Sequence, residues 1–219
     1  MNAKLVALNE ELDQANQMKA NILGIWNHDL RHPIARLVNY LQLKKMSPEA
    51  IDPKIAEEID RQTMQMANNL LQNMEELLVW CKNQMKIFKP VFKETKVSSI
   101  FDSMKSFFSY EQNTTIEFHD PDNLSIITDE DYIKVIIRNL TTNAIKAQVD
   151  IENPYIIWST SKENGRTVLS IQDHGKGISQ KGINMFYQSD AEIPVREGLG
   201  LQIIRDLSKT LGCEVELYS

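Results

Sequence analysis

The N-terminal part of the chain has almost none of the residues that interrupt helices. From Ala3 to about Met46 the only glycine is Gly24 and the only proline is Pro33. An apolar seam with the 3-4 spacing of a coiled coil opens this stretch, at Leu5, Leu8, Leu12 and Ala15. These features predict one long helix, whose first part, residues 1–20, is a coiled-coil lead-in.

A second long helix is predicted from about Pro53 to Met85. Ser47-Pro48 and Asp52-Pro53 separate it from the first helix, and proline after Ser or Asp is a helix-start signal. Its apolar stripe comprises Ile55, Ile59, Met66, Leu70, Met74, Leu77, Leu78 and Val79. Because the two helices cannot bury both stripes alone, we expect a homodimer in which two helical hairpins form a four-helix bundle. A simple antiparallel coiled-coil spacer is the alternative.

The second half of the chain mixes helical and strand periods. Residues 87–95, with Pro90, break the helical pattern and are interpreted as a linker. Helices are predicted at Val97–Tyr110, Tyr132–Gln148 and about Leu199–Leu211, and strands at Thr115–Phe118, Ser125–Thr128, Ile156–Ser161, Thr167–Gln172 and Glu214–Tyr218. The predicted fold class is therefore multi-domain, α then α+β. A long-helix hairpin over 21–86 precedes a sandwich over 96–219, with helices on one face of a mixed sheet.

Composition and charge exclude several functions. The formal net charge is -6 and no dense Lys/Arg cluster occurs, so we expect no nucleic-acid binding. Cys81 and Cys213 form no CxxC motif, which fits a reduced, cytoplasmic setting. The sequence has no run of about 18 apolar residues, so we expect no membrane contact by this fragment. A membrane segment could still lie outside it.

A histidine within the first helix is the first candidate for chemistry. His28 is followed by Asp29, and Pro33 would cost about 3 kcal/mol in a helix interior. An adjacent carboxylate can hold one imidazole nitrogen as N–H and leave the other as a nucleophile. For the dipeptide alone, a surface histidine beside an unrelated aspartate is the simpler interpretation. His32, one turn along, could share a metal with His28, although no third ligand is evident nearby.

A second motif, Arg138–Lys146, places polar side chains on a predicted helix. Asn139, Asn143 and Lys146 fall on one helical face. Amide oxygens are hard, neutral ligands that suit Mg²⁺ among phosphates, and a lysine one turn along can neutralise a phosphate. An ordinary polar helix face would be the alternative if this motif stood alone.

Two glycine motifs follow. Asp173–Ile178 comes directly after a predicted strand, and its two glycines allow the backbone to approach a ligand closely. Asp173 could accept a hydrogen bond from an exocyclic amine. Gly198-Leu199-Gly200-Leu201 precedes a predicted helix, where backbone N–H groups can bind an anion with help from the helix dipole. Alone, each motif could be a common tight turn.

Taken together and in this order, the four motifs resemble the H, N, G1 and G2 boxes of sensor histidine kinases from two-component systems. The resemblance covers nearly the whole chain. It implies a HisKA-type dimerisation and phosphoacceptor domain over 21–86 and a Bergerat-fold (GHKL) ATP-binding domain over 96–219 that is truncated at its C-terminus. It further implies binding of ATP and Mg²⁺, autophosphorylation, and transfer to an aspartate of a response-regulator receiver domain. The chain would be the cytoplasmic part of a larger bacterial sensor.

The resemblance also assigns roles to individual residues. His28 would be the phosphoacceptor and Asp29 its acid/base partner. Asn143 would coordinate Mg²⁺, and Asp173 would accept a hydrogen bond from the adenine amino group. The other ATP-binding positions would be Asn139, Lys146, Gly175, Gly177, Ile178, Phe186, Tyr187, Arg196, Gly198, Leu199, Gly200 and Leu201, with a lid running from Phe186 to Glu197.

Several positions depart from the family pattern. Asn139 stands where related chaperone, topoisomerase and mismatch-repair ATPases place a water-activating Glu, which favours transfer over hydrolysis. His32 replaces a Thr or Asn that is implicated in dephosphorylating the regulator, and Arg196 replaces a glycine. Two alternatives remain open: a non-catalytic ATP-binding dimeric scaffold, which His32 and Arg196 favour, and a Bergerat-fold ATPase, against which Asn139 argues.

Overall fold

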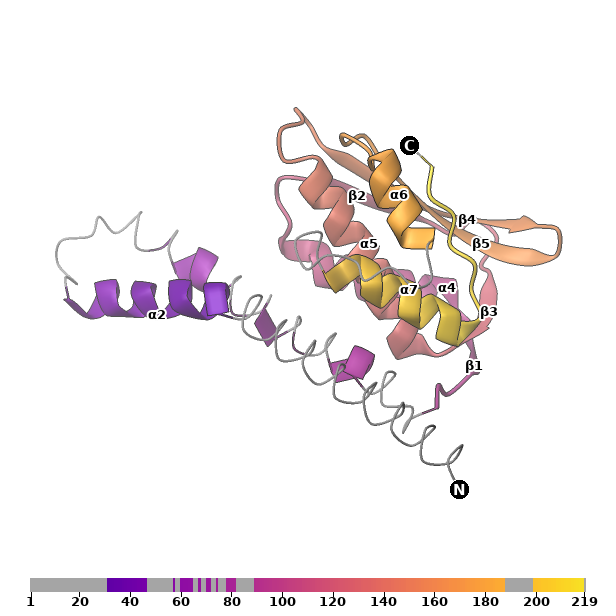
Figure 1. Cartoon of the computed structure of the whole chain (residues 1–219), viewed down its shortest axis with the longest axis horizontal. Coiled ribbons are helices and arrows are strands. Elements are labelled where there is room, and N and C mark those ends of the chain that lie inside the picture. The colour runs from indigo at the N-terminus through magenta and orange to yellow at the C-terminus, as the bar shows by residue number, and fades with distance from the viewer. Residues whose placement is uncertain are drawn as a thin grey trace, which may run out of the picture. The chain divides into compact units, whose positions relative to one another are not determined.

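The computed structural model of this chain describes residues 31–46, 57, 60–64, 67, 70–71, 74, 78–81, 89–187 and 199–218. The chain divides into two compact units, Met1–Cys81 and Lys82–Ser219 (Figure 1). The predicted site residues His28, Asp29, Arg196 and Gly198 lie outside the described residues. Within the described part, no helix is long and apolar enough to cross a membrane.

The N-terminal unit is helical throughout its described part. Helix α2 spans Arg31–Met46 and includes Pro33. Every described residue from 57 to 81 is also helical, and the Tyr40 hydroxyl of α2 donates a hydrogen bond to the Asp60 carboxylate. A four-helix bundle is not evident in the single chain. Several large apolar side chains of these helices are instead exposed, namely Ile34, Val38, Leu41, Met64, Leu71, Met74 and Leu78.

The C-terminal unit is built around a mixed three-stranded sheet, as the sequence predicts. Strand β2 (Thr115–His119) runs parallel to β4 (Tyr155–Glu163), and β4 runs antiparallel to β5 (Arg166–Asp173). A smaller antiparallel sheet joins β1 (Lys93–Lys96) to β3 (Ser125–Thr128). Buried residues alternate along the first six positions of β4, so the helices cover only one face of the sheet.

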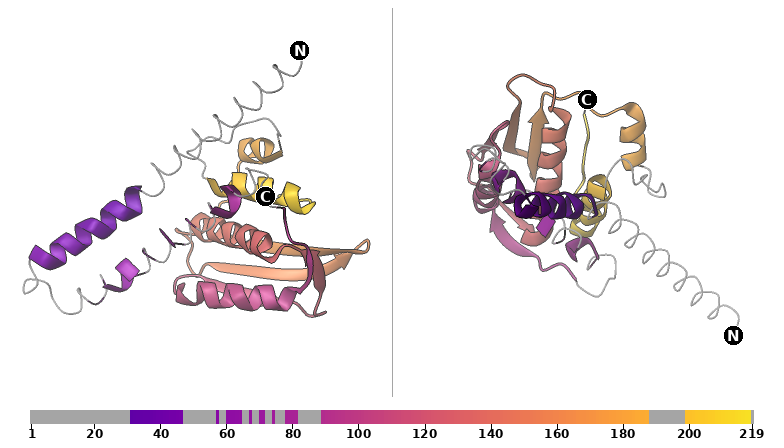
Figure 2. Two further views of the ribbon diagram at one scale, coloured as in Figure 1. Left: turned by 90° about the horizontal axis from the view of Figure 1, so that it is seen from below. Right: turned by 90° about the vertical axis from the view of Figure 1, so that its left-hand side faces the viewer.

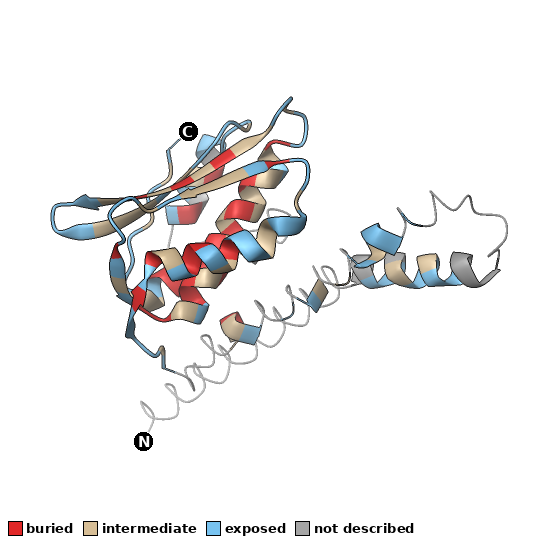
Figure 3. Cartoon of the chain, turned by 180° about the vertical axis from the view of Figure 1, so that it is seen from behind, coloured by how far each residue is buried: buried red, intermediate tan, exposed pale blue. Residues whose placement is uncertain are grey.

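Helices α4 (Val97–Phe107) and α5 (Glu130–Ala147) run alongside the sheet (Figure 2). The Phe101 ring of α4 lies 5.2 Å from the Phe118 ring and 6.3 Å from that of Trp158, measured between centroids. These rings form an aromatic core between α4 and strands β2 and β4. Figure 3 shows the buried residues of this unit gathered along its helices and strands.

Helix α7 (Leu199–Leu211) forms a further layer against α5. Its residues Ile203, Ile204 and Leu207 are buried. Their spacing of one, three and four positions gives α7 a single apolar stripe, and the bounds of this helix agree with those predicted. The helix predicted at 97–110 is also present, and its last turn is a 3₁₀ helix at Phe108–Tyr110.

The β4–β5 hairpin turns at Asn164-Gly165, with φ of +50° and +79°. Positive φ at both central residues is the requirement of a type I′ turn, which Asn-Gly satisfies at low conformational cost. Glu163 pairs with Arg166, so the ladder continues up to the turn. Both strands are therefore longer than the apolar alternation alone predicts.

Three elements differ from the sequence prediction. Strand β1 lies partly inside the predicted linker, because its only buried residue is Thr95 and it has no apolar alternation. Helix α6 (Gln180–Tyr187) was not predicted, since it has eight residues and includes Gly182. The strand predicted at Glu214–Tyr218 is wrong: residues 213–218 form no strand, and the Leu217 N–H donates to the Tyr187 hydroxyl at 2.8 Å.

The N-terminus of α5 is fixed by the carboxylate of Asp129. Its Oδ1 accepts hydrogen bonds from the N–H groups of Asp131 and Tyr132, at 3.1 and 3.2 Å. Its Oδ2 accepts a third from the Val91 N–H at 2.7 Å. One side chain therefore caps the helix and holds the segment that leads into β1, which determines where α5 begins.

Glu130 adds an ion-pair network to this helix start. Its carboxylate lies 2.7 Å from Lys134 Nζ and 2.8 Å from Lys93 Nζ. Hydrogen bonds from Lys134 and then Lys93 lower the pKa of Glu130 from 4.5 to about 2. Because the folded pKa is the lower one, this stabilisation is fully present above about pH 4.5 and is lost as the pH falls toward 2.

We expect Glu130→Gln to lower the free energy of unfolding at pH 7 by about 1 kcal/mol or less, because all three side chains are partly exposed. The difference from the unsubstituted chain should shrink between pH 4.5 and 2, where the carboxylate takes up a proton. Urea unfolding at pH 7, 5 and 3 measures this, with Glu152→Gln on an exposed loop as the control. An equal loss at all three pH values would contradict the proposed network.

Candidate functional site

Asn139 and Asn143 lie one turn apart on α5. Asn139 is 9% exposed, and its Nδ2 donates a hydrogen bond to the Val135 carbonyl at 2.9 Å. This bond fixes which way the side-chain amide is turned, and it leaves Oδ1 as the atom that faces the first turn of α7. The helix that carries the amides thus also orients one of them.

Gly200, in the first turn of α7, packs directly against these amides. A Cβ added to Gly200 would lie 2.8 Å from Asn139 Oδ1 and 3.7 Å from Asn143 Nδ2. A contact of 2.8 Å is too short for a carbon atom, so only glycine permits this approach. Two predicted motifs, separated in sequence by β4, β5 and α6, therefore meet in space.

The first turn of α7 gives this meeting point its electrostatic character. The first four N–H groups of an α-helix have no partner within the helix, and the helix dipole makes this end electropositive. Here that end begins at Leu199 and lies beside the two neutral amides of α5. The combination suits phosphate oxygens and a hard cation.

The turn after β5 meets the other end of α5. Asp173 is the last residue of β5, pairs with Ile156 in the ladder and is exposed. Its Oδ1 accepts the Gly175 N–H at 2.7 Å. A Cβ on Gly175 would lie 2.6 Å from Ala147 Cβ and 2.9 Å from the Ala147 carbonyl oxygen. Gly177, with φ of +70°, completes the turn.

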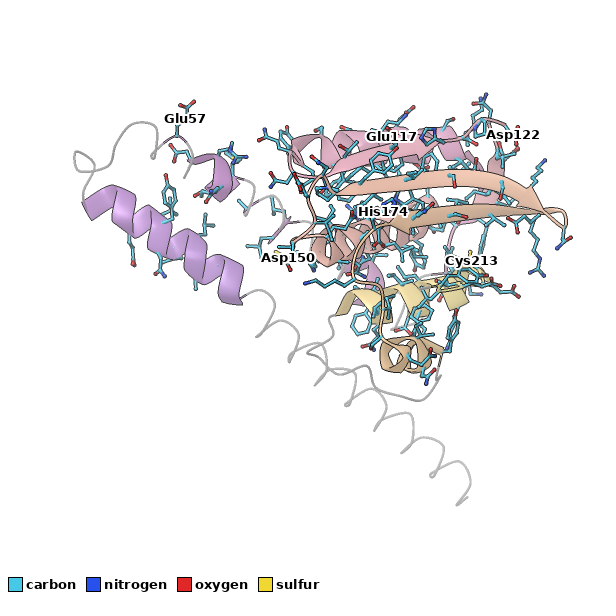
Figure 4. The ribbon with its side chains drawn as sticks, turned by 90° about the horizontal axis from the view of Figure 1, so that it is seen from above. Glu57, Glu117, Asp122, Asp150, His174 and Cys213 are labelled. Atoms are coloured by element: carbon cyan, nitrogen blue, oxygen red, sulfur yellow. The ribbon has the colours of Figure 1, made fainter. Side chains whose placement is uncertain are left out.

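An ion pair joins the same turn to the loop after α5. Lys176 Nζ lies 2.6 Å from the Asp150 carboxylate and lowers the pKa of Asp150. Both side chains are largely exposed, so this pair contributes little to stability. The His174 ring lies 6.4 Å from that of Tyr155 (Figure 4 includes Asp150 and His174).

Other predicted site residues have less informative surroundings. Lys146 on α5 and Ile178 after β5 are exposed, and Leu201 is half-buried in α7. Phe186 and Tyr187 end helix α6, where Phe186 is buried and Tyr187 accepts the bond from Leu217. Their place in the lid stays a prediction.

The donor set around these amides restricts the metal chemistry. Among the described residues, no group of three or more His, Cys, Asp or Glu side chains could hold a metal ion. Amide oxygens and phosphate oxygens are ligands that suit Mg²⁺.

Comparisons with known proteins agree with this geometry. Residues 128–219 match the family model of the histidine kinase-, DNA gyrase B-, and HSP90-like ATPases. The histidine kinase AdeS of Acinetobacter baumannii superposes with a TM-score of 0.58 at 18% identity, over 84% of this chain and 87% of that chain. The C-terminal unit has the α/β fold of this ATPase family.

Curated relatives point to the same family. The adaptive-response sensory kinase SasA of Synechocystis sp. is 26% identical over 90% of this chain and 55% of its own length. The sensor histidine kinase YkoH of Bacillus subtilis is 26% identical over 100% of this chain and 48% of its own. The chain thus spans about half the length of the relatives it matches. Both of these relatives are sensory kinases by name.

The Gly200 contact gives a direct test of the site. We expect Gly200→Ala to displace the Asn139 amide and to weaken ATP binding about tenfold or more, because the added methyl occupies the space of Oδ1. Isothermal titration with ATP and Mg²⁺ measures the affinity.

Gly165→Ala is the matched control. Its positive φ makes alanine strained there, but no atom lies within 4 Å of the added Cβ. It should lower the melting temperature without changing the ATP affinity. Equal ATP affinities for the Gly200→Ala and unsubstituted chains would contradict a phosphate site at the first turn of α7.

Proposed function

We propose that this chain is the core of a protein-histidine kinase, which binds ATP and Mg²⁺ in its C-terminal unit and phosphorylates its own His28. The observation that carries the proposal is the contact of Gly200 with Asn139 and Asn143. It combines neutral oxygen ligands and a helix N-terminus at one place, as a metal-bound triphosphate requires. The family match of residues 128–219 supports the same nucleotide class.

The phosphate end of ATP would be held by α5 and α7. Asn143, with Asn139 beside it, would coordinate Mg²⁺, which neutralises charge on the phosphates. Lys146, one turn further along α5, would supply a positive charge. The backbone N–H groups of Leu199, Gly200 and Leu201 would donate to phosphate oxygens, and the predicted Gly198 and Arg196 would extend this contact.

The adenine end would lie at the turn after β5. Asp173 would accept a hydrogen bond from the exocyclic amine, and its bond with the Gly175 N–H holds the carboxylate in place. Gly175, Gly177 and Ile178 would form the pocket wall beside Ala147. A structural relative, ShkA, was solved in complex with AMPPNP and superposes with a TM-score of 0.52, which supports nucleotide binding by this fold.

The residues favour phosphoryl transfer over hydrolysis. An amide cannot take a proton from water, so Asn139 cannot act as a general base where it lies. A neutral His28 imidazole would instead attack the γ-phosphorus, forming a P–N bond as the bond to the β-γ bridging oxygen breaks and ADP leaves. Asp29 would hold the other ring nitrogen as N–H and then take up the released proton.

The proposed partners of the chain are a second copy of itself and a response regulator. The exposed apolar side chains of the N-terminal helices would be covered by a second copy, giving a homodimer through residues 21–86. The phosphoryl group would pass to an aspartate of a response-regulator receiver domain. The chain would act in the cytoplasm as part of a larger sensor, as the longer relatives suggest.

One alternative function has a specific observation in its favour. His32 stands in α2, one turn after His28, where the resembled family has Thr or Asn. Together with Arg196 in place of a glycine, this departure favours an ATP-binding dimeric scaffold that changes shape without transferring phosphate. ATP binding without any phosphohistidine would identify such a scaffold.

His28→Gln tests the assignment of the phosphoacceptor. We expect the unsubstituted chain, incubated with γ-labelled ATP and Mg²⁺, to gain label that is lost in acid and kept in base. The His28→Gln chain should gain none and should still bind ATP, because His28 is not one of the proposed ATP-binding residues. His119→Gln, which removes an exposed histidine of β2, is the control and should keep the label. Label that survives in His28→Gln would contradict the assignment.

A further inference from the structure

A buried glutamine ends helix α5. Gln148 is 1% exposed, and its side-chain amide is paired at both atoms. Its Nε2 donates to the Ala144 carbonyl at 3.3 Å, and its Oε1 accepts the Tyr155 N–H at 2.9 Å. Its own carbonyl accepts the Ile151 N–H at 2.9 Å, which closes the turn that leads toward β4. One residue therefore joins the end of α5 to the start of β4.

This link lies one residue before the row of the sheet that holds Asp173, the proposed adenine contact. Tyr155, whose N–H it binds, is the first residue of β4, and the next residue, Ile156, pairs with Asp173 on β5. On the helix side, Ala147 directly precedes Gln148 and is the residue against which Gly175 packs. The Gln148 amide thus connects the end of α5, against which Gly175 packs, to β4, which pairs with β5 at Asp173.

A second buried hydrogen bond joins the same two elements farther along. Trp158 Nε1 donates to Thr141 Oγ1 at 2.9 Å, and Thr141 in turn donates to the Ile137 carbonyl at 2.8 Å. Both Thr141 and Trp158 are buried. This bond lies about two helical turns from Gln148 and away from the turn that carries Asp173.

We propose that Gln148 is a positioning residue for nucleotide recognition, and this inference rests on the ATP site proposed above. The amides that would hold the phosphates stand on α5, whereas Asp173 stands on β5. The separation between them depends on how the end of α5 is fixed to β4. Gln148 makes that connection one residue before the β4 partner of Asp173. It therefore sets the separation between the adenine end and the phosphate end of the proposed site.

The physical reason is the environment of the groups that Gln148 pairs. The Tyr155 N–H and the Ala144 carbonyl lose their partners if the amide is replaced by an apolar side chain of similar size. Since unpaired polar groups in a buried place are unfavourable, the segment between α5 and β4 will rearrange until they meet water or another partner. That rearrangement moves the surface on which the Gly175 turn packs.

The test compares Gln148→Met with Thr141→Val in the full chain. Each removes a buried hydrogen bond between α5 and β4 at nearly constant side-chain volume. Both should lower the melting temperature. We expect Gln148→Met alone to raise the Kd for ADP about tenfold and to shrink the preference for ADP over GDP, because only it disturbs the adenine end. Titration calorimetry with ADP and GDP in Mg²⁺ measures both.

If Gln148 had only a structural role, the two variants would not differ in their ADP affinity or in their preference for ADP over GDP. Gln148→Met with an unchanged ADP affinity and ADP-to-GDP preference would overturn the inference, as would Thr141→Val with the same loss of preference. If Gln148→Met does not fold, Gln148→Asn replaces it, since its amide is one methylene too short for the Tyr155 N–H, and the same rise in Kd for ADP and the same loss of preference are expected. An unsubstituted chain that binds neither nucleotide would overturn the proposed ATP site itself, and the inference with it.

Discussion

The close packing of helix α5 against two glycines is the constraint on which the candidate site depends. Gly200 brings the first turn of α7 to Asn139, and Gly175 brings the turn after β5 to Ala147. In both places a single added carbon would collide with atoms of α5. The helix therefore sets the spacing of the candidate site, with the proposed phosphate ligands along one part of it and the proposed adenine contact beside its C-terminal end.

Three buried polar side chains fix the position of α5. Asp129 caps its first turn and binds the Val91 N–H. Thr141 accepts the indole N–H of Trp158 at its middle, and Gln148 binds β4 at its end. Apolar packing alone tolerates small sliding movements, whereas directional hydrogen bonds in a buried setting do not. The polar contacts thus define the position of the helix along its own axis.

The sequence predicted the parts of this arrangement that depend on local pattern. The apolar stripe of α7 gave its bounds, and the mixed sheet followed from the alternating periods. Residue types at motif spacing identified Asn139, Gly175 and Gly200. What local pattern could not supply was the pairing between distant segments. Ala147 and Gln148 have no signal of their own, because an alanine and a glutamine are ordinary at the end of a helix.

The wrong and missed elements have the same origin. The alternation of residues 214–218 resembles a strand, but a strand also needs a partner edge, and the Leu217 N–H binds the Tyr187 side chain instead. Strand β1 forms because it pairs with β3, although its sequence lacks the apolar alternation typical of a strand. Helix α6 is short and includes a glycine, so its formation depends on the burial of Phe186.

The orientation of Asn139 connects this packing to the proposed chemistry. Its Nδ2 must donate to the Val135 carbonyl so that Oδ1 can face α7, and an ionised carboxylate could not make that donation. The position therefore accommodates an amide, which binds without activating water. If Asn139 lies beside the phosphates, as proposed, its amide does not activate water, and the γ-phosphoryl group is transferred only to a nucleophile from elsewhere. His28 is that nucleophile in the proposed mechanism, so the neutral amide at Asn139 and the reactivity proposed for His28 belong to one mechanism.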